Sequence, residues 1–374
     1  MRMSMHRTLR LFALLYPLLS ADIHATPAGA LAVEKKWELA MQKWELETQT
    51  ANTPDARAKA LATRPDATPY AKEMWQNIGG SLKEDWTLEP AAWFLRATPG
   101  LRSSNPDGST SLTFANEIET IRKTVETTHV NSPKLIPMCM AFVASQDPRS
   151  LAFLEKVQAN NPDQRVQGVA ALGAAMILKS LGDDGDIMRK RLTYLRKAII
   201  QSSDVNLGGI SVAKLAEDEL YVIRYLTKGR VAPDLVGMDS AGAPIKLSDY
   251  KGKVVMLLFW SSTMQEAERV FAMTNDMILK FKGEPFVVIG VSQDPLAKQR
   301  SLEAAPVNPV NWKSFSDPTK ELANQYRVGV WPLVYVLDGD RKISFAGPPG
   351  SFAEATVDAL LAPKAPAAKV PAAR

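Results

Sequence analysis

The chain has 374 residues but a single cysteine, Cys139. One cysteine cannot close a disulfide within the chain, which excludes a disulfide-stapled fold and a pair of redox-active thiols in one polypeptide. Cys139 stands in the apolar stretch LIPMCMAFVAS. Because a reactive thiol needs exposure and a positive neighbourhood, we expect Cys139 to be a small buried side chain in a helix. A reactive thiol is the alternative interpretation.

Histidine is almost as scarce, since only His6, His24 and His129 occur. His6 and His24 would leave with the signal peptide predicted below. A single remaining histidine excludes a multi-histidine metal site, and a Ser-His-Asp triad would need His129 to reach a serine of another domain. The three aspartates of SLGDDGDI lack the spacing and the final glutamate of a calcium loop. NLGGI and GPPG are too short to be phosphate loops. We therefore predict no metal and no cofactor.

The first residues have the pattern of a secretory signal peptide. Three arginines in MRMSMHRTLR precede the apolar run LFALLYPLL, and small residues follow. This run is much shorter than the roughly 20 residues of a membrane-spanning helix. We predict a signal peptide over residues 1–25, cleaved after Ala25 or, as the second choice, after Ala30. The mature protein would then be periplasmic or extracellular and have no membrane span.

The net charge does not indicate nucleic acid as a partner. The formal charge of +5 falls to +3 when cleavage removes three arginines and one aspartate. The sequence also has no run of basic residues interleaved with aromatic ones. We therefore exclude nucleic acid as a partner.

Residues 31–228 have the periodicity of helices. In KWELAMQKWELE, the side chains of Trp37, Met41 and Trp44 fall on one helix face, which indicates a packing stripe. Further amphipathic segments follow, separated by Asn-Pro-Asp, Gly-Asp-Asp and Gly-Gly. Stacked antiparallel helix pairs, as in a solenoid, would bury their apolar faces. LRSSNPDGSTS between them is typical of an exposed loop.

The periodicity changes at residue 231. KVVMLLFW, PFVVIGVSQD, PLVYVLDGD and RKISFAG are rich in strand-forming residues, with helical stretches between the first two and before the third. This order predicts an α/β domain with a mixed sheet over residues 231–362. The tail at 363–374 is rich in proline and alanine, and we expect it to be disordered.

The second domain resembles a known family. APDLVGMDSAGAPIKLSDYKGKVVMLLFW, VVIGVSQD and SDPTKELANQYRVGVWPLVYVLDGDRKI are similar to the TlpA-like thioredoxin domains, relatives of the AhpC/TSA redoxins. The resemblance covers residues 231–362 and implies an α/β thioredoxin-like domain with a mixed central sheet flanked by helices, which follows the all-α N-terminal helical domain that the periodicity predicts. It also implies a cis peptide bond between Trp331 and Pro332, and it places the two cysteines of the family's Cys-x-x-Cys motif at Met264 and Ala267.

Neither of these positions can perform the family's chemistry. A thiolate at the helix N-terminus attacks a disulfide, and a second thiol releases the product. Methionine has no ionisable proton, and alanine has no functional group. Ser261, Ser262 and Thr263 offer hydroxyls, but we see no adjacent base in the sequence. Thr263 together with Glu266 is instead predicted to form a capping box at the start of the helix.

We therefore interpret the second domain as redox-inactive and predict no catalytic residue. The predicted function is to bind a polypeptide partner or to act as a scaffold in the cell envelope. The candidate binding groove comprises Trp260, Thr263, Met264, Gln265, Trp331 and Pro332. Trp331 has two interpretations, a plug that fills the vacant groove or an aromatic anchor for the partner. The alternative function is a thiol-disulfide oxidoreductase or peroxiredoxin-type enzyme that uses Cys139 or an intermolecular disulfide.

Overall fold

The computed structural model describes residues 26–362 apart from 52, 146, 183 and 265. The chain divides into two compact units, one up to Val212 and one from Ala213 onward. The predicted signal peptide and the predicted disordered tail lie outside the described residues. Among the helices that the structure describes, none is long and apolar enough to cross a membrane.

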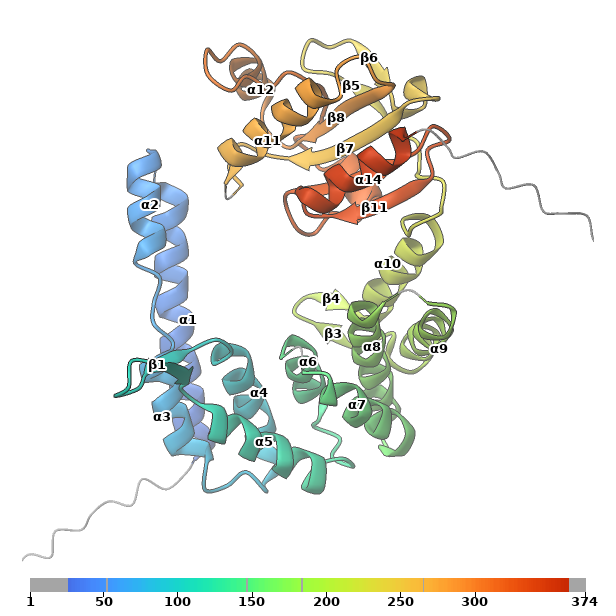
Figure 1. The fold of residues 1–374 in the computed structure, drawn as a ribbon. Coiled ribbons are helices and arrows are strands. Elements are labelled where there is room, and N and C mark those ends of the chain that lie inside the picture. Colours follow the sequence, from blue (N-terminus) through green and yellow to red (C-terminus); the bar gives the residue numbers. More distant parts are fainter. Residues whose placement is uncertain (1–25, 52, 146, 183, 265, 363–374) are drawn as a thin grey trace, which may run out of the picture. The chain divides into compact units, whose positions relative to one another are not determined.

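The first unit is helical, as predicted (Figure 1). Its helices in chain order are α1 (Pro27–Thr50), α2 (Pro54–Ala62), α3 (Thr68–Ile78), the 3-10 turn η1 (Asp85–Thr87), α4 (Leu88–Ala97), α5 (Ala115–Thr128), α6 (Ile136–Ala144), α7 (Arg149–Asn160), α8 (Gln164–Leu181) and α9 (Gly185–Ser202). Four of these helices, α1, α2, α8 and α9, begin at a side-chain cap: Thr26, Thr53, Asp163 and Asp184 each accept a backbone N–H of the first turn.

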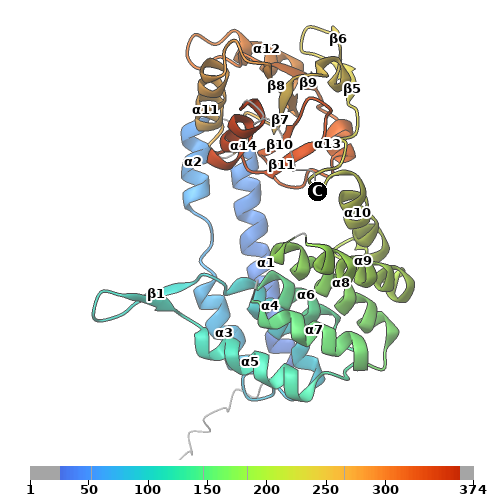
Figure 2. The ribbon, with the colours of Figure 1, turned by 45° about the vertical axis from the view of Figure 1, so that its right-hand side comes forward.

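Two short hairpins interrupt the helices of this unit. The segment predicted as an exposed loop forms β1 (Arg102–Ser104) and β2 (Thr110–Leu112), which pair antiparallel and remain exposed (Figure 2). β3 (Asn206–Leu207) and β4 (Ile210–Ser211) form the second hairpin. Its turn is Gly208-Gly209, with φ of 59° and 90°, a conformation that glycine adopts without a steric cost.

Helices α7, α8 and α9 pack side by side, as the predicted stacking of helix pairs requires. Small residues of α8 permit this packing. A Cβ placed on Gly168 would lie 2.0 Å from the Ser202 hydroxyl oxygen of α9, which donates to the Arg165 carbonyl oxygen at 2.7 Å. A larger side chain at residue 168 would therefore push α9 away from α8.

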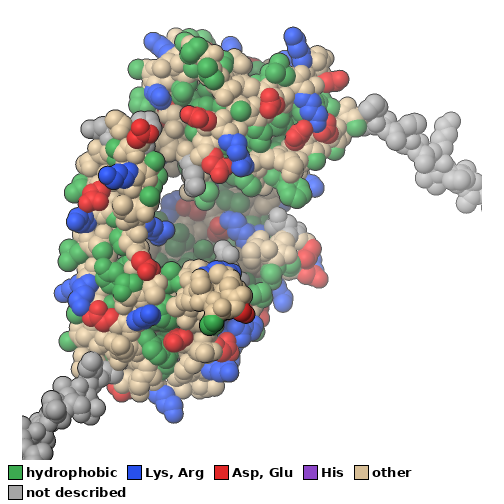
Figure 3. Space-filling view, turned by 60° about the vertical axis from the view of Figure 1, so that its left-hand side comes forward, with side chains coloured by type: hydrophobic (Ala, Val, Ile, Leu, Met, Phe, Trp, Pro, Cys, Tyr) green, Lys and Arg blue, Asp and Glu red, His purple; other side chains and the backbone are tan. Residues whose placement is uncertain are grey.

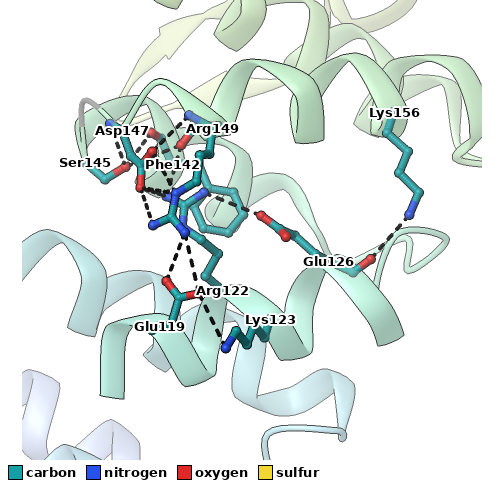
Figure 4. Close-up of polar contacts among 10 residues, drawn as sticks. Glu119, Arg122, Lys123, Glu126, Phe142, Ser145, Asp147, Arg149 and Lys156 are labelled. Atoms are coloured by element: carbon teal, nitrogen blue, oxygen red, sulfur yellow. Dashed lines mark hydrogen bonds and ion pairs between the residues drawn. The ribbon is translucent and has the colours of Figure 1, made fainter. Parts of the chain in front are cut away.

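A buried arginine joins α5 to the α6–α7 corner (Figure 4). The Arg122 side chain is 4% exposed, and its guanidinium lies 4.7 Å from the centre of the Phe142 ring. It forms ion pairs with Asp147 at 3.3 Å and with Glu126 at 3.5 Å, and it donates to the Ser150 hydroxyl. These partners compensate the cost of burying the charge, so the cluster is a structural junction.

His129 is buried in a second polar junction of the helical unit. Its Nδ1 lies 2.9 Å from Asp85 Oδ1, and its Nε2 lies 2.8 Å from the Leu82 carbonyl oxygen. Ser132 Oγ donates to the other oxygen of Asp85 at 2.8 Å. Serine, histidine and aspartate thus meet in one place, but the serine contacts the aspartate and the second ring nitrogen contacts a carbonyl. This order is not that of a catalytic triad, in which the histidine must contact the serine.

The second unit contains the predicted mixed sheet. Its strands lie in the order β11 (Ile343–Gly347), β10 (Leu333–Leu337), β7 (Val254–Trp260), β8 (Phe286–Ser292) and β9 (Lys313–Ser316). β7, β8 and β9 are parallel, whereas β10 is antiparallel to both β7 and β11. β9 and the outlying hairpin of β5 (Val236–Met238) and β6 (Pro244–Lys246) were not predicted, since their short sequences carry little strand signal.

Two hydrophobic cores cover the two faces of this sheet. On one face, α11 (Ala267–Lys280) and α14 (Ser351–Leu361) pack against alternate residues of β7 such as Leu258 and Trp260. On the other face lie η2 (Leu247–Tyr250), α13 (Glu321–Gln325) and the end of α10 (Val212–Tyr225). α12 (Leu296–Glu303) follows β8. All seven residues of β7 are buried, as expected for a central strand that is covered on both sides.

The domain boundary differs from the predicted one by one helix. The sequence assigned α10 to a helical domain that ends at residue 228, because its periodicity is helical. In the structure, Tyr221 and Val222 pack against the core of the second unit, which also includes Leu226. The Arg327 guanidinium lies 4.3 Å from the Tyr221 ring centre and forms an ion pair with Asp218. These contacts place α10 with the second unit.

The Asp85 junction predicts a pH-dependent stability. Burial raises the pKa of Asp85, but the hydrogen bonds from Ser132 and His129 together hold it below its ordinary value. A carboxyl whose pKa is lower in the folded state stabilises the fold above its unfolded pKa, about 4, and this contribution is lost as the pH falls further. We expect Asp85→Asn to lower the free energy of unfolding by about 1 kcal/mol near neutral pH.

The measurement is urea unfolding of the full chain, followed by far-ultraviolet circular dichroism, near neutral pH and in acid. The difference between wild type and Asp85→Asn should shrink in acid. Glu45→Gln, which changes an exposed carboxylate, is the control. An equal difference at both pH values would contradict a role for the Asp85 charge.

Candidate functional site

The candidate site lies at the carboxyl ends of the parallel strands β7 and β8. β7 ends at Trp260 and continues into Ser261, Ser262 and Thr263, while β8 ends at Ser292 and leads to Asp294. The register pairs Trp260 with Ser292, so the two loops leave the sheet side by side. Loops at this edge of an α/β sheet are the usual place for a functional site.

A buried carboxylate fastens the loop after β7. Asp294 is 3% exposed, and its Oδ1 accepts the Ser261 hydroxyl at 2.7 Å. The backbone N–H of Ser262 lies 2.9 Å from Oδ2 and 3.1 Å from Oδ1. The Asp294 carbonyl oxygen in turn accepts the side-chain amide of the buried Gln299 at 2.6 Å. The loop is therefore held by polar contacts that involve no thiol.

This arrangement shows whether the hydroxyls of Ser261 and Thr263 are activated as nucleophiles. Ser261 is 8% exposed and directs its hydroxyl to Asp294, or exchanges a hydrogen bond with the Thr263 hydroxyl at 2.9 Å. Both Asp294 oxygens already accept hydrogen bonds. An aspartate carboxylate is a weak base, and no histidine lies between it and the serine. The geometry is that of a loop anchor, not of an activated serine.

The predicted capping box at Thr263 is wrong. The helix begins at Ala267, and its N-cap residue is Glu266, with a left-handed φ of 59° and no side-chain cap. Thr263 is exposed, and its hydroxyl and its N–H both contact the Ser261 hydroxyl oxygen. The reason is that the Ser261–Asp294 contact fixes the chain two residues before Thr263, which leaves Thr263 in a turn before the helix.

The two positions assigned to the family's cysteines lie at and just before the start of α11. Met264 and Ala267 are both partly buried and pack against the core on the α11 face. Gln265, which the sequence also placed in the groove, lies outside the described residues. Val270 and Phe271 of this helix are buried, and the buried Thr274 donates its hydroxyl to the Val270 carbonyl.

Trp260 does not belong to a surface groove. Its side chain is 1% exposed, and its Nε1 donates to the Ser314 hydroxyl at 3.1 Å. The ring packs edge-on against Phe271 and Trp312. The prediction that Trp260 contacts a partner is therefore wrong, because the alternation of β7 directs this residue into the core beneath α11.

The cis peptide bond between Trp331 and Pro332 is confirmed. Both residues are partly exposed, and the preceding Val330 is 76% exposed. The Trp331 ring packs at 80° to Phe259, with ring centres 6.1 Å apart, against the core opposite to that of Met264. Trp331 thus fills a space beside the sheet and still leaves part of its surface exposed.

The comparisons with known proteins concern this unit. Residues 228–346 match the AhpC/TSA family model. The C-terminal unit is therefore thioredoxin-like and is similar to the AhpC/TSA redoxins. The family match, the mixed sheet and the cis-proline together support this assignment.

The relatives of this thioredoxin domain carry names of redox enzymes. The thiol-disulfide oxidoreductase ResA of Geobacillus kaustophilus is 28% identical over 117 residues, which are 31% of this chain and 66% of that protein. ResA of Bacillus subtilis is 27% identical over 120 residues, 32% of this chain and 65% of that protein. The matches thus span slightly less than two thirds of these relatives.

Two solved structures cover the same part of the chain. The thioredoxin domain of a thiol-disulfide oxidoreductase from Bacteroides vulgatus is 25% identical, with a TM-score of 0.32, and the match covers 36% of this chain and 98% of that one. Peroxidoxin BcpB from Mycobacterium tuberculosis is 25% identical, with a TM-score of 0.30, and the match covers 36% and 94%.

The single thiol is in the other unit. Cys139 lies in α6 of the helical unit, and its side chain is fully buried, as predicted. Burial raises the pKa of the Cys139 thiol to about 12. At neutral pH the thiolate, which is the reactive form, is therefore very rare. The thioredoxin domain itself contains no cysteine.

Sequence reasoning missed Asp294. The signal was available, because VSQD places an aspartate just after a parallel strand, and carboxyl ends of adjacent parallel strands meet at one edge. Its partner could not be read from the sequence, since Ser261 and Asp294 are 33 residues apart. Only the register of β7 with β8 brings the two loops together.

The loop anchor predicts that Asp294→Ala destabilises the thioredoxin domain. The substitution leaves the Ser261 hydroxyl and the Ser262 N–H without their acceptor, which should cost about 1–3 kcal/mol. Urea unfolding of the full chain measures the loss. Asp340→Ala, which removes an exposed carboxylate from the β10–β11 turn, should change the free energy of unfolding by less than about 0.5 kcal/mol. Equal effects of the two substitutions would show that Asp294 anchors nothing.

Proposed function

We propose that this protein is an exported cell-envelope protein whose thioredoxin domain performs no redox chemistry and binds an extended polypeptide partner. The binding rim comprises Met264, Val330, Trp331 and Pro332, with Thr263 beside it. The observation that carries the proposal is the loop after β7, which has the position of a thiol site in this fold but is anchored by Asp294 and has no cysteine. Export rests on the signal-peptide pattern of residues 1–25.

The absence of redox chemistry follows from the residue types. Thiol-disulfide exchange transfers a sulfur–sulfur bond through a thiolate, and neither Met264 nor Ala267 can form one. The names of the relatives favour the alternative, an oxidoreductase acting through Cys139. The complete burial and the raised pKa of Cys139 count against it, because exchange requires an exposed thiolate.

The binding rim is supported by its exposed apolar surface. Val330 is 76% exposed beside the partly exposed Trp331 and Pro332. Met264 is also partly exposed. A half-buried aromatic ring held by core packing is preorganised, and an anchor of this kind loses little conformational freedom when a partner binds. The part of Trp331 that packs on the core therefore acts as the plug, and its exposed part is the anchor for the partner.

The first test concerns Cys139. In the native full chain, a thiol reagent should label Cys139 orders of magnitude more slowly than in denaturant, because labelling requires local unfolding. The chain should also fail to accelerate the reduction of insulin disulfides by dithiothreitol. Rapid native labelling, together with insulin reduction that disappears in Cys139→Ser, would establish the oxidoreductase alternative and overturn the proposal.

The second test concerns the rim. A photo-crosslinking amino acid at residue 330, in the full chain expressed in its source cells, should form a defined adduct with an envelope polypeptide. The matched control is residue 307, because Val307 is 75% exposed and Val330 is 76% exposed. Met264→Asp should reduce the adduct at least about tenfold, since it places a charge on the apolar rim.

Two results of the crosslinking experiment would contradict the proposal. Adducts of equal yield from residues 330 and 307, or adducts that Met264→Asp leaves unchanged, would show that the rim is not a binding surface. The circular dichroism spectrum of each variant verifies that it is folded.

A further inference from the structure

The helical unit contains a hollow that the proposed function does not use. It has a volume of about 530 Å³ and lies where α1, the turn after α2 and the end of α4 meet. Its apolar wall consists of Trp37, Met41, Pro65, Trp93, Pro99 and Leu101. We call it the tryptophan hollow. Its volume is in the range of pockets that bind small molecules or one or two side chains of a peptide.

The aromatic wall is held in place by contacts between aromatic rings. The Trp37 ring packs edge-on against Trp93, with centres 6.3 Å apart, and against Tyr70, with centres 5.3 Å apart. The stripe of α1 that the sequence assigned to packing therefore does pack, but Trp37 and Met41 also line the hollow. Indole rings fixed in this way offer a rigid apolar surface to a ligand.

The charged residues of the hollow give it a positive balance. Arg64, Arg96 and Asp66 line it. The Asp66 carboxylate accepts the Thr68 N–H at 2.8 Å at the start of α3, and the Arg64 guanidinium lies 5.6 Å from the Trp44 ring centre. Within the described part of the chain, neither Arg64 nor Arg96 forms an ion pair with a carboxylate. Each guanidinium can therefore bind an anionic group without first breaking an ion pair within the protein.

Other charges nearby do not cancel this balance. The end of α4 contributes roughly half a negative charge, which is less than the charge of either arginine. Glu34 interacts with Arg96 but does not line the hollow, and burial and then Glu89 raise the pKa of Glu34. Figure 3 shows green hydrophobic side chains exposed among blue Lys and Arg and red Asp and Glu side chains.

We propose that the tryptophan hollow binds an acidic polypeptide segment in which a carboxylate side chain lies next to an aromatic or large apolar one. The carboxylate would pair with Arg64 or Arg96, and the apolar side chain would pack on Trp37 and Trp93. Such a ligand matches the two properties of the hollow, a rigid apolar wall and two guanidinium groups that form no ion pair with a carboxylate in the described part of the chain. The site is independent of the rim on the thioredoxin domain.

The test is isothermal titration calorimetry on the full chain with the peptide acetyl-Glu-Phe-Glu-Phe-amide. The uncharged peptide acetyl-Gln-Phe-Gln-Phe-amide has the same shape and should bind at least about tenfold more weakly, since a charge-assisted hydrogen bond is lost. Arg64→Gln and Arg96→Gln should each weaken the binding of the acidic peptide by a similar factor. Both side chains are exposed, so these variants should fold.

Two controls separate this site from general charge and from the rim. Arg165→Gln removes an exposed arginine of the same unit that does not line the hollow, and it should leave the affinity unchanged. Met264→Asp should also leave the peptide affinity unchanged, because Met264 belongs to the rim. Failure of the hollow proposal is therefore distinguishable from failure of the proposed function. Equal binding of the two peptides, or binding that survives both arginine variants, would overturn the proposal. Binding of 2-naphthoate as tight as that of the acidic peptide would assign the hollow to a small carboxylate instead.

Discussion

The structure of the thioredoxin domain depends on the complete burial of β7. A strand buried on both faces needs a helical layer on each side and a partner strand on each edge, and residues 254–260 have both. Its odd residues enter one core and its even residues the other. The end of β7 is therefore fixed in space, and the loop that follows it occupies the same place whatever chemistry its residues offer.

The loop after β7 keeps its place in the fold without a cysteine. In this chain, the Asp294 carboxylate holds Ser261 and the Ser262 backbone from the neighbouring strand's loop. The anchor needs a hydroxyl, an N–H and a buried acceptor, and none of these is a redox group. Fold and chemistry therefore rest on different residues, which explains how a domain related to thiol enzymes can have no thiol of its own.

The helical unit uses its polar residues in two ways. Arg122 and His129 are buried and fully occupied with partners, so they stabilise junctions between helices. Arg64 and Arg96 are exposed beside an aromatic wall and have no carboxylate partner among the described residues. Residue type alone does not separate these roles. Burial and the presence of a partner separate them, and both are properties of the tertiary structure.

The sequence by itself determined which segments are helices and strands, because periodicity and caps are local. It also determined the resemblance of the second domain, the burial of Cys139 and the absence of cysteine from residues 231–362, since these follow from residue types and motifs. It misplaced the start of α11, the exposure of Trp260 and the position of α10, and it missed β9.

Only the tertiary structure decided these points, because each depends on residues far apart in the chain. Asp294 reaches Ser261 through the β7–β8 register, and α10 joins the core through Tyr221 and Val222. Residues of α1 and of the end of α4 are likewise far apart in the sequence and line the tryptophan hollow together. A local pattern fixes a residue's conformation, but its neighbours across the fold fix what its side chain can do.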